Sequence, residues 1–127
     1  MTFIQVAAEF PGLAASLQAL SAGDLDQAVR RIVETALATT GVEVPDRSRG
    51  ALEQLVWSLD DAAWDLQEKA ERGASSSSLY NQAFRRARAA SGLLELQEGH
   101  YGRAVFEATH ALGGHEGTVL RILDGSA

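Results

Sequence analysis

Hydrophobic residues recur at helical spacing along most of the chain, and the longest such stretch covers about residues 48–72. Spacings of three and four keep its aliphatic positions on one side of a 3.6-residue helix. Other helices must pack against this stripe to bury it, so we expect 48–72 to be the long central helix of a bundle. The stripe consists of Leu52, Leu55, Val56, Leu59, Ala63, Leu66 and Ala70.

Shorter helical patterns lie on both sides of this stretch. Residues 3–9 are mixed and fit either an extended arm or a helical turn, and Pro11 suits the first turn of a helix that ends near residue 21. Asp24 is expected to cap a second helix. Its apolar stripe consists of Leu25, Ala28, Val29, Ile32, Val33, Ala36 and Leu37.

After the long helix, a serine linker at residues 75–78 precedes helical patterns over about 79–98 and 100–112. One of these serines is expected to cap the helix that follows. A short last helix holds Val119, Ile122 and Leu123. The connections are short, which predicts antiparallel neighbours. The sequence therefore predicts an all-α fold, with residues 1–127 forming a single-domain antiparallel bundle of four to five helices.

The charge and composition of the chain narrow its possible partners. The formal net charge is −6, which disfavours nucleic acid because phosphate binding needs a basic face, and which permits a basic protein partner. There is no cysteine, so thiolate metal sites and disulfides are excluded and a cytoplasmic location is expected. No stretch approaches 18 apolar residues, and the first residues lack the basic leader of a signal peptide, so we expect no membrane association.

Two tryptophans on the long helix lie away from its aliphatic stripe. Trp57 and Trp64 are seven residues apart, so they follow one side of the helix, and Phe84 and Phe106 also lie off the stripes of their own helices. The pattern favours a second layer of core around a helix that is buried on two sides. The alternatives are a partly exposed aromatic patch with an acidic rim, typical of a partner-binding or homodimer surface, and a small-molecule pocket.

The same helix carries carboxylates that could pair with arginines of the next helix. In a hairpin centred near residue 75, Asp65 would face Arg85, and Arg88 would lie near Asp61. The interpretation that the pattern favours is a set of ion pairs between two helices. Asp61, Asp65, Arg85 and Arg88 are also the candidate polar cluster of a ligand or catalytic site.

The other candidate motifs give weaker indications of a catalytic or binding site. A Glu-x-x-His step at Glu107 and His110 puts both side chains on one helical face, but a di-iron bundle needs two such steps, and no second one occurs. Phosphate loops, nucleophile elbows and zinc spacings are missing from the sequence. The basic run Arg85-Arg86-x-Arg88 could bind phosphate, although internal pairing is favoured. No metal and no cofactor are expected.

One part of the chain resembles other proteins. The runs DDAAWDLQEKAERG and AFRRARAASGLLEL, within residues 60–96, resemble segments of small uncharacterised all-helical proteins of high-GC bacteria. This resemblance implies a compact helical fold. It implies no activity, because no activity is attached to those segments.

These observations favour a non-enzymatic interaction or regulatory module over an enzyme. We expect it to bind a protein partner, or a second copy of itself, through a face that carries tryptophans. The alternative is a small-ligand-binding or enzymatic bundle that uses the polar cluster of Asp61, Asp65, Arg85 and Arg88. The expected partner face consists of Trp57, Trp64, Asp60, Asp61 and Glu68.

Overall fold

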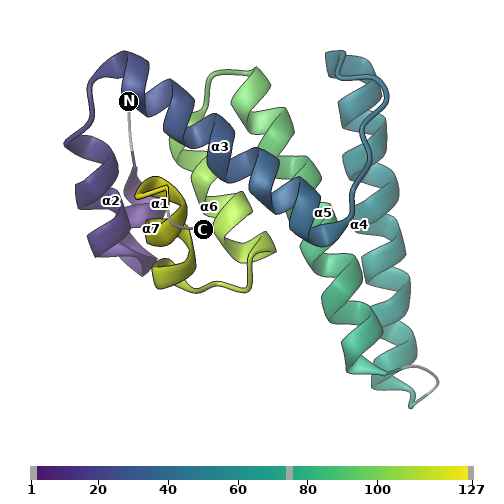
Figure 1. Cartoon of the computed structure of the whole chain (residues 1–127). Helices are drawn as coiled ribbons and strands as arrows, with labels where there is room; N and C mark the ends of the chain where they lie inside the picture. Colours follow the sequence, from purple (N-terminus) through teal and green to yellow (C-terminus); the bar gives the residue numbers. More distant parts are fainter. Residues whose placement is uncertain (1–2, 74–75, 126–127) are drawn as a thin grey trace.

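The structure of the chain is a computed structural model that describes residues 3–73 and 76–125. Every regular element in these two ranges is a helix, which confirms the predicted all-α class. Seven helices pack together there, where the sequence indicated four to five, and short helices at the two ends of the chain account for the difference (Figure 1). They are α1 (Ile4–Glu9), α2 (Pro11–Gln18), α3 (Ala22–Thr40), α4 (Arg49–Glu71), α5 (Ser77–Gln97), α6 (Tyr101–Ala111) and α7 (Glu116–Leu123).

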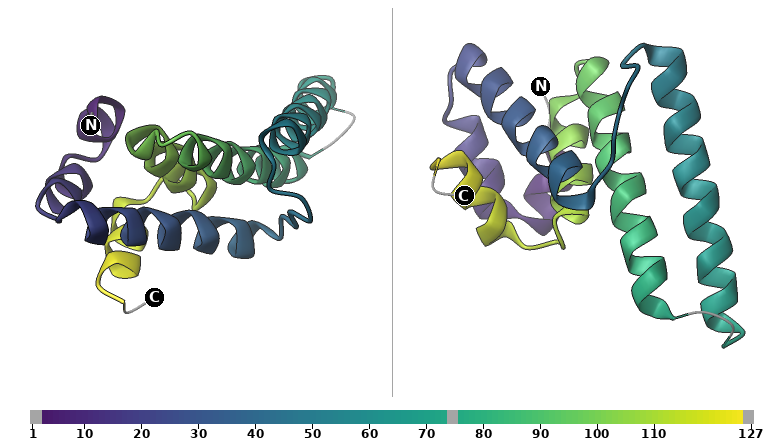
Figure 2. Two further views of the ribbon diagram at one scale, coloured as in Figure 1. Left: turned by 90° about the horizontal axis from the view of Figure 1, so that it is seen from above. Right: turned by 45° about the vertical axis from the view of Figure 1, so that its right-hand side comes forward.

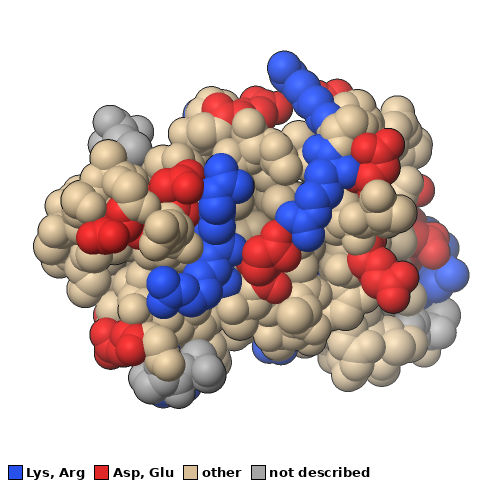
Figure 3. Space-filling model, turned by 45° about the horizontal axis from the view of Figure 1, so that its top comes forward, with Lys and Arg blue, Asp and Glu red and all other residues tan. Residues whose placement is uncertain are grey.

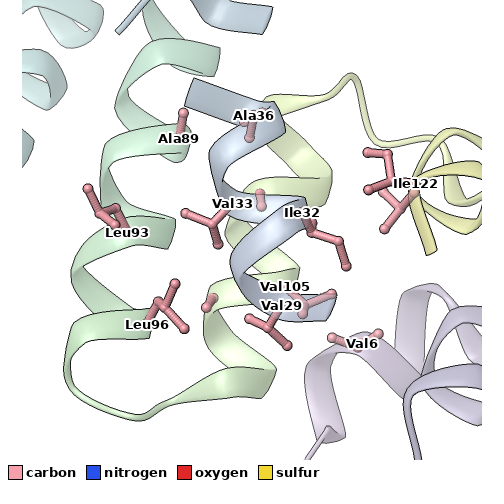
Figure 4. Packing of buried hydrophobic residues seen from close by; sticks show 14 of the residues in the cluster. Val6, Val29, Ile32, Val33, Ala36, Ala89, Leu93, Leu96, Val105 and Ile122 are labelled. Carbon is pink, nitrogen blue, oxygen red and sulfur yellow. The ribbon is translucent and has the colours of Figure 1, made fainter. Parts of the chain in front are cut away.

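The core lies where α3, α5 and α6 meet. Each of these helices packs against the other two, and α3 covers one side of the α5–α6 pair (Figure 2). Side chains from all three helices fill the space between them, with Val33 and Ala36 of α3 turned toward Leu93 and Ala89 of α5 (Figure 4). All seven residues of the predicted α3 stripe are buried.

The α5–α6 contact depends on small side chains. Gly92 is a helical residue of α5, and a Cβ atom at this position would lie 3.3 Å from the backbone oxygen of Ala104 on α6. That distance is shorter than an ordinary van der Waals contact, so a larger residue would require the facing backbone to move by a few tenths of an ångström, and the glycine permits the observed close approach. Ala104 and Ala108 supply the facing surface of α6, and both are fully buried.

The ends of the chain cover one end of this core. Phe3, Val6 and Phe10, in and around α1, are all buried, so this segment is part of the core and includes a short helix. The Glu116 side chain of α7 accepts a hydrogen bond from the backbone N–H of Leu13 at 3.2 Å. This contact satisfies a free amide in the first turn of α2 and joins the two ends of the chain.

The long helix α4 does not have the central position that its stripe predicts. Its main neighbour is α5, and the two helices form a hairpin that extends beyond the others (Figure 1, Figure 2). Of the α4 residues, only Leu52 and Ala63 are buried, and the rest of the stripe is half-buried. The expectation of a long central helix is therefore wrong. One partner helix is enough to cover an aliphatic stripe of this width, so α4 can lie at the edge of the fold.

The caps of two helices differ in part from the expected ones. Ser21 caps α3 and accepts the backbone N–H of Asp24 at 3.3 Å, so the helix begins before Asp24. Ser76 caps α5 in the same way through the N–H of Leu79, as expected for one of the linker serines. Ser75, also in that linker, lies outside the described residues. None of the described helices combines the length and apolar character needed to cross a bilayer.

Candidate interaction face on α4

The two tryptophans of α4 are exposed to solvent. The exposed fraction is 68% for Trp57 and 64% for Trp64, so neither belongs to the core. The favoured interpretation of the sequence, a second core layer around a central α4, is wrong for these two residues. The cause is the peripheral place of α4, because a helix with one main neighbour buries only one side.

Carboxylates surround the two indoles. Asp60 and Asp61 are three and four residues after Trp57, and Glu68 is four residues after Trp64, so all three lie beside the indoles on the helix surface. Asp60 and Asp61 are exposed, and Glu68 is half-buried beside Arg72, to which it is linked at 3.8 Å. The α4 face, which we define as these five residues, is thus an aromatic surface with an acidic rim.

Arg88 of α5 connects this face to the body of the protein. Its guanidinium donates to Asp60 of α4 at 2.5 Å and to Glu107 of α6 at 2.8 Å, so it bridges three helices. Its Cζ atom lies 5.6 Å from the ring centre of Phe84, in cation–π range. Phe84 itself is 36% exposed. Arg88 therefore links Asp60, one of the carboxylates of the α4 face, to an exposed ring on α5.

The environment of Arg88 favours its charged form. Partial burial alone would lower the pKa of the Arg88 guanidinium, but the negative charges of Glu107 and Asp60 outweigh that effect, and the pKa is raised. Only 21% of the Arg88 side chain is exposed, and its buried Nε has no hydrogen-bond partner among the described residues. Arg88 is therefore a fixed cation between helices and not a free ligand-binding group.

The predicted polar cluster is only partly assembled. Arg88 takes part in the hairpin pairing, but its partner on α4 is Asp60 and not Asp61. Asp65 pairs at 3.0 Å with Lys69 on its own helix and not with Arg85. Among the described residues, neither Asp61 nor Arg85 has an ion-pair partner. These side chains therefore do not converge on one site.

The Glu-x-x-His step takes part in contacts between helices. Glu107 binds Arg88, and His110 lies 3.1 Å from the carboxylate of Glu9 on α1. The His110 ring also packs edge-on against Phe106, with ring centres 4.8 Å apart. Within residues 3–73 and 76–125, no group of three or more metal-ligand side chains could hold a metal ion.

Sequence reasoning missed the link from α5 to α6. Glu107 appeared only as half of a possible metal motif, and Phe84 only as an aromatic residue without a position. The pairing of Phe84 and Arg88 at i, i+4 could have indicated a cation beside an exposed ring on the α5 surface, but it does not indicate the link to α6. The third helix at this junction could not be inferred, because it depends on tertiary packing.

Charges of both signs are mixed over the surface shown in Figure 3. Acidic and basic side chains alternate there between uncharged areas, and no extended basic area is visible on that face. A surface that binds nucleic acid needs such an area.

No family model matches the chain, and no significant match is found among the curated proteins or the solved structures. The resemblance of residues 60–96 to small helical bacterial proteins stays a prediction. The function must therefore be argued from the geometry and the chemistry of this chain alone.

Proposed function

We propose that this protein is a non-enzymatic interaction module whose α4 face binds a basic surface of a partner protein. The observation that carries the proposal is the exposure of two indoles, 68% and 64%, on a helix with one main neighbour. Tryptophan is enriched among the residues that dominate binding energy, because burying its large ring at an interface contributes strongly to affinity. A cytoplasmic location, expected from the sequence, is part of this proposal.

The charge of α4 favours a basic partner. The helix carries six carboxylates and two basic side chains. Lysine or arginine side chains of a partner could pair with this rim and also lie over the indole faces. A second copy of the chain suits the face less well. A two-fold interface places the same patch of both subunits against itself, and acidic residues would then face acidic residues.

The rival function, a small-ligand site built from the polar cluster, has less support. Asp65 and Arg88 are engaged in ion pairs with other residues, and Asp61 is exposed on α4. A catalytic or binding site needs ionisable groups that converge on one point. An exposed aromatic face with a charged rim needs only a complementary surface, and it is the arrangement that supports the interaction module.

The experiment that tests the proposal uses a photo-crosslinking amino acid at Asp61, between the two tryptophans. The matched control carries the same amino acid at Ala38, an exposed position on α3. Cross-linking in the host cells, followed by mass spectrometry, identifies what contacts each position. Each captured protein is then purified, and its affinity is measured for the wild type and for Trp57→Ala/Trp64→Ala.

We expect a protein with a basic surface to be captured at position 61 and not at position 38. The double alanine variant should bind it at least 30-fold more weakly, since loss of a hot-spot side chain costs about 2 kcal/mol or more, and its melting temperature should be unchanged. Capture of the chain itself, together with a doubled mass in solution, would show that the partner is a second copy of this protein. An unfolded double variant would refute the proposal, because the indoles would then stabilise the fold.

A further inference from the structure

A second feature is a polar hollow of about 280 Å³, and none of its described lining residues belongs to α4. It lies where the ends of α3 and α6 meet the first half of α5, and its polar lining comes from two arginines, two threonines and a glutamine. Among the described residues that line it there is no carboxylate, although the chain carries 17 acidic residues. The lining residues are Thr39, Thr40, Gln82, Arg85, Arg86, Ala111 and Leu112.

The two arginines of this hollow differ from most others in the chain. Arg30, Arg47, Arg49, Arg72 and Arg88 each form an ion pair with a carboxylate. Arg85 and Arg86 are exposed, and neither has an ion pair or a hydrogen bond within the described parts of the chain. In a protein with an excess of carboxylates, two consecutive arginines without a counter-charge among the described residues, both lining one hollow, leave a local excess of positive charge.

We propose that this hollow binds a small organic oxyanion, a phosphate monoester or a carboxylate, through Arg85 and Arg86. Guanidinium groups bind both kinds of anion with paired hydrogen bonds. The Gln82 amide and the Thr39 hydroxyl add polar groups beside them, whereas the Thr40 hydroxyl donates to the Ala36 carbonyl at 2.7 Å. Ala111 and Leu112 provide apolar surface for a small organic body. This proposal does not depend on the interaction face, because the hollow and the α4 face share no residue.

A rival explanation for the two arginines lies in the helix ends. α3 ends at Thr40 and α6 ends at Ala111, and the C-terminal end of a helix carries partial negative charge that a cation stabilises. Under that explanation the arginines stabilise the fold and bind nothing. The two explanations differ in a measurable way, because only the first predicts saturable binding of an added anion.

The test is an NMR titration of the isotope-labelled protein with phenyl phosphate and, separately, with benzoate. Benzyl alcohol, which has the same ring and no charge, is the control ligand, and inorganic phosphate shows whether the organic body contributes. Arg85→Gln and Arg86→Gln remove one guanidinium each. Arg103→Gln is the matched control variant, because Arg103 is also an exposed arginine without an ion pair among the described residues, and it does not line the hollow.

We expect at least one of the two anions to bind with a Kd below about 1 mM. The shifted amide signals should belong to Thr39, Thr40, Gln82 and Leu112. Either Arg→Gln change at the hollow should raise this Kd at least tenfold, and Arg103→Gln should leave it unchanged. The stronger of the two anions identifies the head group.

Three results would overturn the proposal. The first is no saturable shift with either anion, which would leave the helix-end explanation. The second is a set of shifts spread over arginines throughout the surface. The third is a Kd that does not change in Arg85→Gln and Arg86→Gln. A well-dispersed spectrum of each variant shows that it is folded, so a loss of binding cannot be attributed to unfolding.

Discussion

Substitution of Arg88 by alanine is the sharpest test of how the α4–α5 hairpin is held to the body of the protein. The change removes the guanidinium that joins Asp60 of α4 to Glu107 of α6. We expect the free energy of unfolding to fall and α4 to become less protected, because α4 has few other contacts outside α5.

The size of the effect follows from the exposure of the two carboxylates. The Asp60 side chain is 47% exposed, so its ion pair contributes little, about 0–1 kcal/mol. The Glu107 side chain is only 21% exposed, and a hydrogen bond between charged groups at such a site contributes about 1.5–3 kcal/mol. The expected loss is therefore about 1.5–4 kcal/mol, with a midpoint of about 2.7 kcal/mol. An unfolding entropy near 2.1 cal/mol/K per residue converts this loss to a drop in melting temperature of about 10 °C.

The assay is urea denaturation of the wild type, Arg88→Ala, Glu107→Gln and the double variant, with Arg103→Ala as the control. A double-mutant cycle should give a coupling energy of about 1 kcal/mol or more between Arg88 and Glu107, and the control should change stability by less than about 0.5 kcal/mol. Hydrogen exchange should be faster along α4 in Arg88→Ala. A loss below about 0.5 kcal/mol, or zero coupling, would refute the reasoning.

Three further changes test other contacts. Glu116→Ala removes the acceptor for the Leu13 amide in the first turn of α2 and should cost about 1 kcal/mol in urea denaturation; equal stability would show that water replaces the cap. Gly92→Val forces a branched side chain into the α5–α6 contact and should cost about 1–3 kcal/mol, so an unchanged melting temperature would contradict the close approach. The pKa of Asp26 is lowered, first by the hydrogen bond from Arg30 and then by the one from the Tyr101 hydroxyl. The ionised Asp26 carboxylate therefore stabilises the fold above its unfolded-state pKa, and this stabilisation is lost as pH falls through its folded-state pKa. Tyr101→Phe should raise the pKa of Asp26, measured by carboxyl NMR titration. It should also reduce stability at neutral pH, but not at pH values below both the folded and the unfolded pKa of Asp26. An unchanged pKa would exclude the contact.

The sequence predicts the helices well because each apolar stripe reports one buried side. Every predicted stripe residue of α3 is buried, and the long helix was expected at 48–72 and is observed at Arg49–Glu71. The interior of α5 was predicted less well. Spacing alone puts Leu79, Ala83, Ala87, Ala90 and Leu94 on its inner face, but Ala89, Gly92 and Leu93 are also buried, and Leu79 is exposed. The reason is that α5 has three helix neighbours, and its buried arc is wider than one stripe.

The candidate site was predictable in composition but not in position. The sequence places Trp57 and Trp64 on one side of a helix among carboxylates, and this much follows from spacing alone. Whether that side is core or surface depends on how many helices cover α4. The periodicity of the sequence gives no information about that number. The hairpin register placed Arg88 close to its observed partner, since Asp60 adjoins the expected Asp61. The junction with Glu107 of α6 could be read only from the packing.

The exposed indoles are difficult to explain by folding alone. Burial of a large apolar side chain contributes about 1.5–3 kcal/mol, and neither Trp57 nor Trp64 is buried in this fold. The positions beside them are occupied by Asp60, Asp61 and Glu68, so a charged residue is clearly compatible with this surface of the helix. A stable hairpin needs only the seam toward α5, which other residues supply. Two large rings kept in water within an acidic rim therefore support the proposal that a basic partner surface buries them.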